Sequence, residues 1–206
     1  MATAGATRET ITLKGSTAIV TEFFGYAVDS ILYQRGIYPE ENFTRVKKYG
    51  LSMLVCTDER VRDYLKQVLS QISEWLLTGK LQKLVLVVAS VATKEVLERW
   101  AFNIETDKES VQTGTTREKS DKEIMSEIQA IVRQITASIT FLPLLDETCT
   151  FDLLAYTAAD SAVPSTWEES DARLINKSAE VKLRSFSTKV HQVDAMVAYK
   201  NDDEGD

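Results

Sequence analysis

The sequence is short of the side chains that most enzyme sites need. It contains one histidine, His191, and two cysteines, Cys56 and Cys149, in 206 residues. Hydrolysis by a serine or cysteine nucleophile needs a base and an orienting acid beside it, and a bound metal needs closely spaced ligands. The eight glycines form neither a GxGxxG nor a GxxxxGK[ST] phosphate-binding loop. We therefore expect no catalytic residue, no cofactor and no metal, and we expect both cysteines to be buried free thiols.

Long apolar runs and an excess of positive charge are also missing. No stretch is apolar for long enough to span a bilayer, and the opening residues MATAGATRET lack the basic flank and apolar run of a signal peptide. The 24 basic residues are outnumbered by 31 acidic ones, and the net charge of −7 argues against a nucleic-acid-binding protein. We expect a protein of the cytosol or nucleus, with no membrane or nucleic-acid partner. A basic peptide would suit its charge.

Apolar residues recur at helical spacing in three stretches, 16–36, 57–77 and 120–143. The first is apolar nearly all round, which is typical of a helix at the centre of a fold. The third begins with a capping box from Ser120 to Glu123 and stops at a proline. Its buried stripe is expected to consist of Ile124, Ile128, Ile131, Val132, Ile135, Ile139 and Leu142.

Period-two alternation and continuous apolar runs predict the strands. We expect a short strand at 9–15, an irregular hairpin at 37–56, a central hairpin made by 83–90 and 94–105, and strands at 145–157 and 181–200. In the central hairpin one face should carry Val96, Trp100, Phe102 and Ile104. Residues 106–119 show no apolar pattern and are expected to be a mobile surface loop.

The order of these elements predicts an α+β fold, with three helices packed on one face of a mostly antiparallel sheet. We expect a single domain over residues 1–206. Its core should extend over about 11–157, and residues 158–180 are rich in turns and begin an arm that ends at about 200.

The apolar residues of the closing stretch, 181–200, move from one face of the predicted strand to the other twice. Val181 and Leu183 share one parity, Phe186 and Val190 the other, and Val193 returns to the first. A strand can change face in this way only at a bulge, a turn or a break. His191 lies inside this stretch, where a lone strand histidine is more often a surface or pairing residue than a catalytic one.

Two surfaces could bind partners. On the third helix, Arg133 and Phe141 lie opposite the buried stripe, either as anchors of an interface or under another element of the same domain. Residues 147–157 could form a sheet edge that either the terminal strands or an extended partner peptide would extend. An arm with two possible edges to dock on would be a switch.

Long and uncommon strings of residues give the chain a specific resemblance. They are SILYQRGIYP (30–39), FTRVKKYGL (43–51), VLERWAFNIE (96–105), IVRQITASITFLPLL (131–145), WEES (167–170) and MVAYK (196–200). From about Ile11 to Lys200 the chain resembles the HORMA domain proteins of the spindle assembly checkpoint. An alternative within the same fold is a HORMA adaptor of translesion DNA synthesis or of meiotic chromosome axes.

The resemblance implies a protein without catalytic activity that adopts two folds. In the open form the terminal strands lie beside 147–157. In the closed form they cross to the opposite edge, displace the N-terminal strand around Ile11 and Leu13, and leave the first edge to a peptide that the arm encloses like a safety belt. The implied peptide edge consists of Cys149, Phe151, Leu153, Ala155 and Tyr156. The implied mobile arm includes Trp167, Phe186, Val190, His191, Val193, Val197 and Tyr199.

The resemblance also implies partners. The peptides would come from the checkpoint scaffold mitotic arrest deficient one and from the Cdc-twenty type activator of the anaphase-promoting complex. Arg133, Gln134 and Phe141 would form the surface for an open–closed homodimer and for regulators, namely a Bub-family checkpoint kinase and a comet-type HORMA protein. An AAA+ remodelling ATPase would act on the N-terminal segment at Ile11 and Leu13. The implied locations are the nucleus, the kinetochore and the cytoplasm.

Overall fold

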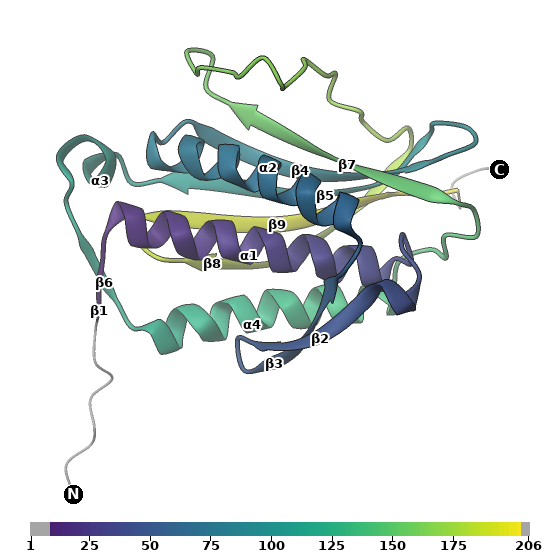
Figure 1. Ribbon diagram of the computed structural model, residues 1–206, viewed down its shortest axis with the longest axis horizontal. Coiled ribbons are helices and arrows are strands. Elements are labelled where there is room, and N and C mark those ends of the chain that lie inside the picture. Colours follow the sequence, from purple (N-terminus) through teal and green to yellow (C-terminus); the bar gives the residue numbers. More distant parts are fainter. Residues whose placement is uncertain (1–8, 203–206) are drawn as a thin grey trace, which may run out of the picture.

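The computed structural model describes residues 9–202 (Figure 1). The acidic tail from Asp203 onward lies outside the described residues. The elements are β1 (Glu9–Ile11), α1 (Leu13–Gln34), η1 (Glu40–Asn42), β2 (Phe43–Lys48), β3 (Leu51–Cys56), α2 (Glu59–Leu77), β4 (Leu81–Ser90), β5 (Val96–Thr106), α3 (Lys108–Thr113), β6 (Arg117–Lys119), α4 (Asp121–Ala137), η2 (Ser138–Thr140), β7 (Cys149–Thr157), β8 (Ser178–Ser187) and β9 (His191–Lys200).

A five-stranded antiparallel sheet in the order β7-β4-β5-β9-β8 forms the centre of the fold. Helices α1, α2 and α4 pack on one of its faces, which confirms the predicted α+β architecture (Figure 1). Apolar residues of these helices meet the sheet in one core, where Phe23 lies edge-on against Phe102 and Phe186. Within residues 9–202 no helix is long and apolar enough to cross a membrane.

The C-terminal hairpin lies beside β5. Strand β9 pairs with β5 along its length, from Tyr199 opposite Glu98 to His191 opposite Thr106, and β8 forms the outer strand of the sheet. Strand β7 pairs with β4 and stands at the opposite edge. The terminal strands therefore take the position that the resemblance implies for the closed form.

The N-terminal boundary between strand and helix differs from the prediction. Strand β1 ends at Ile11 and pairs with β6, apart from the main sheet, and Leu13 is already helical. Thr12 is the N-cap, because its hydroxyl accepts a hydrogen bond from the amide of Gly15 at 2.9 Å. Ser16, with which the predicted helix 16–36 began, instead lies buried in the first turns of α1.

Residues 106–119 are ordered secondary structure and not the loop that the sequence predicted. Asp107 caps α3 by accepting from the amide of Ser110, and Gly114 ends it with a φ of 69°. Strand β6 then pairs with β1. Both elements are polar and short, so neither produces an apolar periodicity.

Helix α4 ends earlier than predicted. Ser120 does cap it, accepting from the amide of Glu123 at 3.1 Å, but regular helix stops at Ala137 and η2 follows. The tighter winding of a 3₁₀ turn shifts the following side chains around the axis. Ile139, predicted in the buried stripe, is therefore 58% exposed, whereas Leu142 is buried as predicted.

Irregularities in register explain why some apolar residues change face. A shift between Val88 and Ala89 of β4 places Val96 opposite Ala89, so Val96 packs with Val85 and Val87 instead of with Trp100. This corrects the predicted face of β5.

The two changes of parity in the closing stretch have the kinds of cause that we predicted. Lys182 lies opposite Met196 and Ser185 opposite Asp194, so two residues of β8 face the single residue Ala195. This bulge lets both Leu183 and Phe186 point into the core. The second change occurs at the turn between β8 and β9, where Lys189 has a φ of 69°.

Candidate functional site

The outer edge of β7 is the candidate site. No other strand within residues 9–202 pairs with this edge. Phe151 and Leu153 point into the core, with Cys149 and Ala155 packed at its border, so the predicted common face is observed. Tyr156 lies on the opposite face, where its hydroxyl accepts a hydrogen bond from Arg99 at 3.0 Å. Side chains on both faces thus hold β7 in place, and no strand of the described residues pairs with the backbone along its outer side, which we call the free side.

Tyr64 of α2 reaches this free side. Its hydroxyl accepts a hydrogen bond from the amide of Leu153 at 3.1 Å, and its ring lies edge-on against Phe151. Burial raises the pKa of Tyr64 further above the neutral range. Tyr64 therefore occupies the place in which a carbonyl of an added strand would accept from β7.

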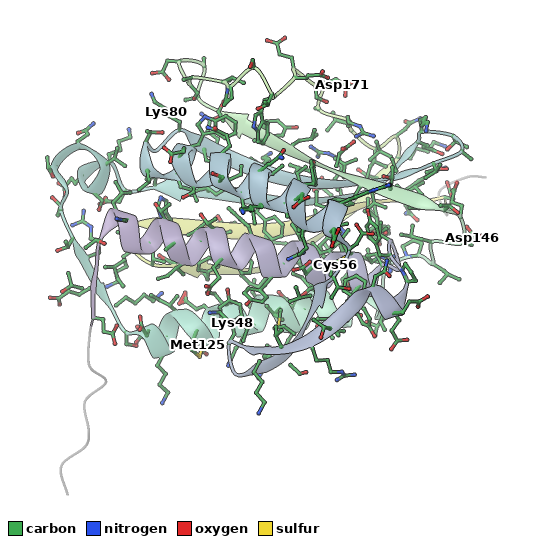
Figure 2. The ribbon with its side chains drawn as sticks, in the orientation of Figure 1. Lys48, Cys56, Lys80, Met125, Asp146 and Asp171 are labelled. Atoms are coloured by element: carbon green, nitrogen blue, oxygen red, sulfur yellow. The ribbon has the colours of Figure 1, made fainter. Side chains whose placement is uncertain are left out.

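The part of the arm that precedes β8, residues 158–177, is fixed at both ends and crosses over the β7 edge (Figure 1). At its start, the amide of Ala158 donates to the carbonyl of Lys80, and Lys80 pairs with Asp160 at 2.6 Å. Near its end, Arg173 pairs with Asp152 of β7 at 2.7 Å. Lys80 and Asp171, which are labelled in Figure 2, lie toward the start and the end of this segment.

Two tryptophans hold the middle of the arm against α2. The indole nitrogen of Trp75 donates to the carbonyl of Ala162 at 3.0 Å, and its ring lies edge-on to Trp167 with centroids 4.9 Å apart. We predicted Trp167 as an arm residue, and it lies where the arm meets the helix. Such a contact lets the arm enclose a segment without a covalent link.

Two cavities lie between the arm and the rest of the protein, beside these contacts. One, of about 440 Å³, lies between residues 153–157 of β7, Trp75 and residues 167–172 of the arm. The other, of about 970 Å³, lies between α2, Trp167 and the β7 edge. The carboxylates that line them are Asp63, Asp152, Glu168, Glu169 and Asp171. Lys66 is the one basic residue among those that line them. These two cavities beside the β7 edge, called the channel below, suit an extended peptide that carries positive charge.

Sequence reasoning did not find Tyr64 or assign a site role to Trp75. Both occupy positions of an amphipathic helix, where an aromatic residue is normally a packing residue. The polar atom of each ring is the informative part, because the phenol and the indole N–H meet backbone groups of β7 and the arm. Neither contact has a signal in the local sequence.

The three residues predicted for an interaction surface lie at the C-terminal half of α4 and just beyond it. Arg133 is exposed and lines a cavity of about 470 Å³ that it shares with Arg45 and Tyr33. Phe141 is 39% exposed, so no described element fully covers it. The side-chain oxygen of Gln134 accepts from the amide of Arg184 in the β8 bulge at 2.6 Å.

Helix α4 also meets the outer edge of β8 elsewhere. Glu127 accepts from the amide of Ser187 at 3.3 Å, and Lys119 donates to the carbonyl of Ser187 at 2.8 Å. Side chains of α4 and of the residue before its cap thus occupy backbone groups that an edge strand leaves unpaired.

The predicted arm residues of the C-terminal hairpin lie in the core. Phe186, Val190, Val193 and Val197 are buried, and Tyr199 is half-buried against them. His191 is buried too and lies opposite Thr106 in the sheet, so of the two alternatives, a surface residue or a pairing residue, the second is observed. At the other terminus Ile11 is buried and Leu13 is half-buried. Cys56 is buried as expected, Cys149 is half-buried, and both are free thiols.

The described residues include no group of three His, Cys, Asp or Glu side chains that could hold a metal ion.

Comparison with known proteins finds relatives that match nearly the whole chain. The HORMA domain model matches residues 16–191. The chain is 60% identical over 203 residues to a mitotic spindle checkpoint protein MAD2 of Zea mays, with 98% of each chain covered. It is 55% identical over 190 residues to the mitotic spindle assembly checkpoint protein MAD2A of Homo sapiens, covering 92% and 93%.

The structure is also similar to a chain in a crystal structure of a mitotic checkpoint complex. The TM-score is 0.83 at 48% identity, and the match covers 91% of this chain and 99% of the other. The chain belongs to the HORMA domain family and, within it, to the MAD2 group of spindle checkpoint proteins.

Proposed function

We propose that this protein is a non-enzymatic adaptor of the spindle assembly checkpoint that switches between an open and a closed fold and clamps a partner peptide, so that anaphase is delayed. The observation that supports it most is the unpaired outer edge of β7 under an arm anchored at both ends. A peptide added there would gain backbone hydrogen bonds from β7, and the arm would have to open before the peptide could leave.

The proposed peptides come from the scaffold mitotic arrest deficient one and the Cdc-twenty type activator of the anaphase-promoting complex. The high identity to spindle checkpoint proteins over nearly the whole chain favours this reading over translesion synthesis or meiotic axes. We further propose action at kinetochores, in the nucleus and in the cytoplasm.

We propose a single domain, with a core at about 11–157 and the safety-belt arm at about 158–200. Arg133, Gln134 and Phe141 would bind a second, open copy, a Bub-family kinase or a comet-type HORMA protein. An AAA+ ATPase would pull on the segment at Ile11 and Leu13. The pairing of this segment with β6, outside the main sheet, supports that role.

Deletion of residues 197–206 tests the clamp. It removes the end of β9 that pairs with Glu98–Trp100 of β5, so the hairpin should no longer hold the closed position. We expect the deleted chain to lose the activator peptide in a pull-down. A deletion of 203–206 leaves β9 complete and should bind normally. Normal affinity of the longer deletion would contradict the proposal.

A further inference from the structure

Three buried polar side chains connect the C-terminal hairpin to the helices. The Ser16 hydroxyl of α1 lies 2.5 Å from the Thr188 hydroxyl and 2.7 Å from Nδ1 of His191. The other ring nitrogen, Nε2, lies 3.4 Å from the carbonyl oxygen of Leu76 in α2. All three side chains are at most 1% exposed. None of them belongs to the channel described above.

When the ring of His191 is neutral, its two hydrogen bonds can run in only one direction. Burial lowers the pKa of His191 to about 4, so the ring is neutral at pH 7. The Leu76 carbonyl can only accept, so Nε2–H donates to it and Nδ1 accepts from the Ser16 hydroxyl. Having donated its proton to Nδ1, Ser16 can only accept from Thr188, whose hydroxyl also lies 3.3 Å from the His191 carbonyl and whose oxygen accepts from the amide of His191 at 2.9 Å. Each buried polar atom thereby has a partner.

The cluster depends on the position of the hairpin. Ser16 and His191 are 175 residues apart in the chain and meet because β9 lies beside β5, with His191 opposite Thr106. Moving β9 from there to the free side of β7 would carry it across four strand spacings, about 19 Å. The Leu76 carbonyl would keep the amide of Gly79 as a donor, but the buried hydroxyl of Ser16 would lose both of its partners in the hairpin, which is unfavourable.

We propose that Ser16, Thr188 and His191 form a latch that holds the C-terminal hairpin on β5 and so sets how long the clamp retains a peptide. The latch rests on the proposed clamp function and adds its regulation. The residues are positioning residues, because they lie away from the channel and act through β9. The opposing view is that they are ordinary core residues, which would affect all parts of the fold alike.

The first experiment measures the lifetime of a peptide complex with the full chain. A fluorescent peptide carrying the clamp-binding segment of the Cdc-twenty type activator is captured, chased with unlabelled peptide, and followed by anisotropy. We expect Ser16→Ala to shorten the half-life about tenfold or more, because it removes the hydrogen-bond donor of the buried Nδ1 and the partner of Thr188. Ser138→Ala is the matched control, because Ser138 is equally buried and donates to the carbonyl of Ile135 within its own helix end.

Thermal unfolding of the same variants separates the two views. Ser138→Ala should lower the melting temperature and leave the half-life unchanged. Equal half-lives for Ser16→Ala and Ser138→Ala would overturn the latch. Adding Thr188→Val to Ser16→Ala should shorten the half-life by less than the product of the two single effects, because both remove the same chain of bonds.

Hydrogen exchange tests the latch without any peptide. In Ser16→Ala, amides of β8 and β9 should exchange faster while those that join β4 to β7 stay protected. A uniform increase over the whole sheet would refute the latch. If β8 and β9 alone exchange faster in Ser16→Ala but the wild type captures no peptide, the proposed clamp is refuted and the role of the latch in holding the hairpin is not. The two failures can therefore be distinguished.

Discussion

Two buried ionisable residues respond to acid in opposite directions. Asp29 of α1 accepts from the amide of Cys56 at 3.2 Å and forms an ion pair with Arg62, yet its burial raises its pKa to about 6. Burial of His191 lowers its pKa to about 4. Burial disfavours the charged form in both cases. Because an acid is charged at high pH and an imidazole at low pH, the two residues strain the fold at opposite ends of the range.

The Asp29→Asn variant should reveal how protonation of His191 changes the free energy of unfolding. Below pH 6.5 the unfolded chain binds a proton at His191 before the folded chain does, so the free energy of unfolding falls by about 3 kcal/mol as the pH falls to 4. Asp29 has the opposite effect, since the folded carboxyl binds its proton first, and contributes a gain of about 3 kcal/mol over a similar range.

Urea titrations at pH 6.5, 5 and 4 would measure this. From these two residues the wild type should change little, Asp29→Asn should lose stability on acidification, and His191→Gln should gain it. A parallel course for the wild type and Asp29→Asn would contradict the assignment. The position of His191 in a strand was predictable from sequence, but its burial was not, because it depends on Ser16 and on Leu76, 115 residues away.

At the scale of elements, periodicity predicted what depends on apolar patterning. The three long helices, the central hairpin and β7 follow from it, and the parity of the closing stretch required the bulge that β8 contains. Polar elements such as α3 and β6 were missed for the same reason. Alternation also shows which side chains share a face but not which strand lies alongside, so residues alone could not choose between β5 and β7 for the hairpin.

Tyr64→Phe tests the free edge of β7 as an element. Without the hydroxyl, the amide of Leu153 has no competitor for a carbonyl of an added strand. We expect activator peptide to bind about 2- to 10-fold more tightly, the range for one net hydrogen bond, as measured by titration calorimetry.

Tyr38→Phe provides the control for this change. The ring of Tyr38 also packs on Phe151, and within residues 9–202 its hydroxyl has no hydrogen-bond partner, so its loss should leave affinity unchanged. Weaker binding by Tyr64→Phe would mean that the phenol contacts the peptide and does not compete with it.

At the scale of the whole molecule, capture and self-association should be separable. The peptide channel lies at the β7 edge, whereas Arg133 lies on α4, which packs against β8 at the other end of the sheet. We expect Arg133→Glu to leave folding and peptide capture intact and to abolish self-association, because a charge reversal at an interface anchor is strongly unfavourable.

Size-exclusion chromatography and a peptide pull-down on the same protein would measure both properties. Lys122→Glu makes the same change in charge on an exposed position in the first turn of α4 and should still form the dimer. A dimer of unchanged size for Arg133→Glu would refute the proposed surface.

The side chains that α4 places along β8 have a consequence for assembly. Gln134 and Glu127 occupy amides of Arg184 and Ser187, so that border of the sheet is closed to further backbone pairing at these positions. Strand addition is therefore hindered at this border, and β7 is the outer edge of the main sheet that is left to an added segment. Two polar side chains on a helix thus protect part of this border from edge-to-edge pairing of copies.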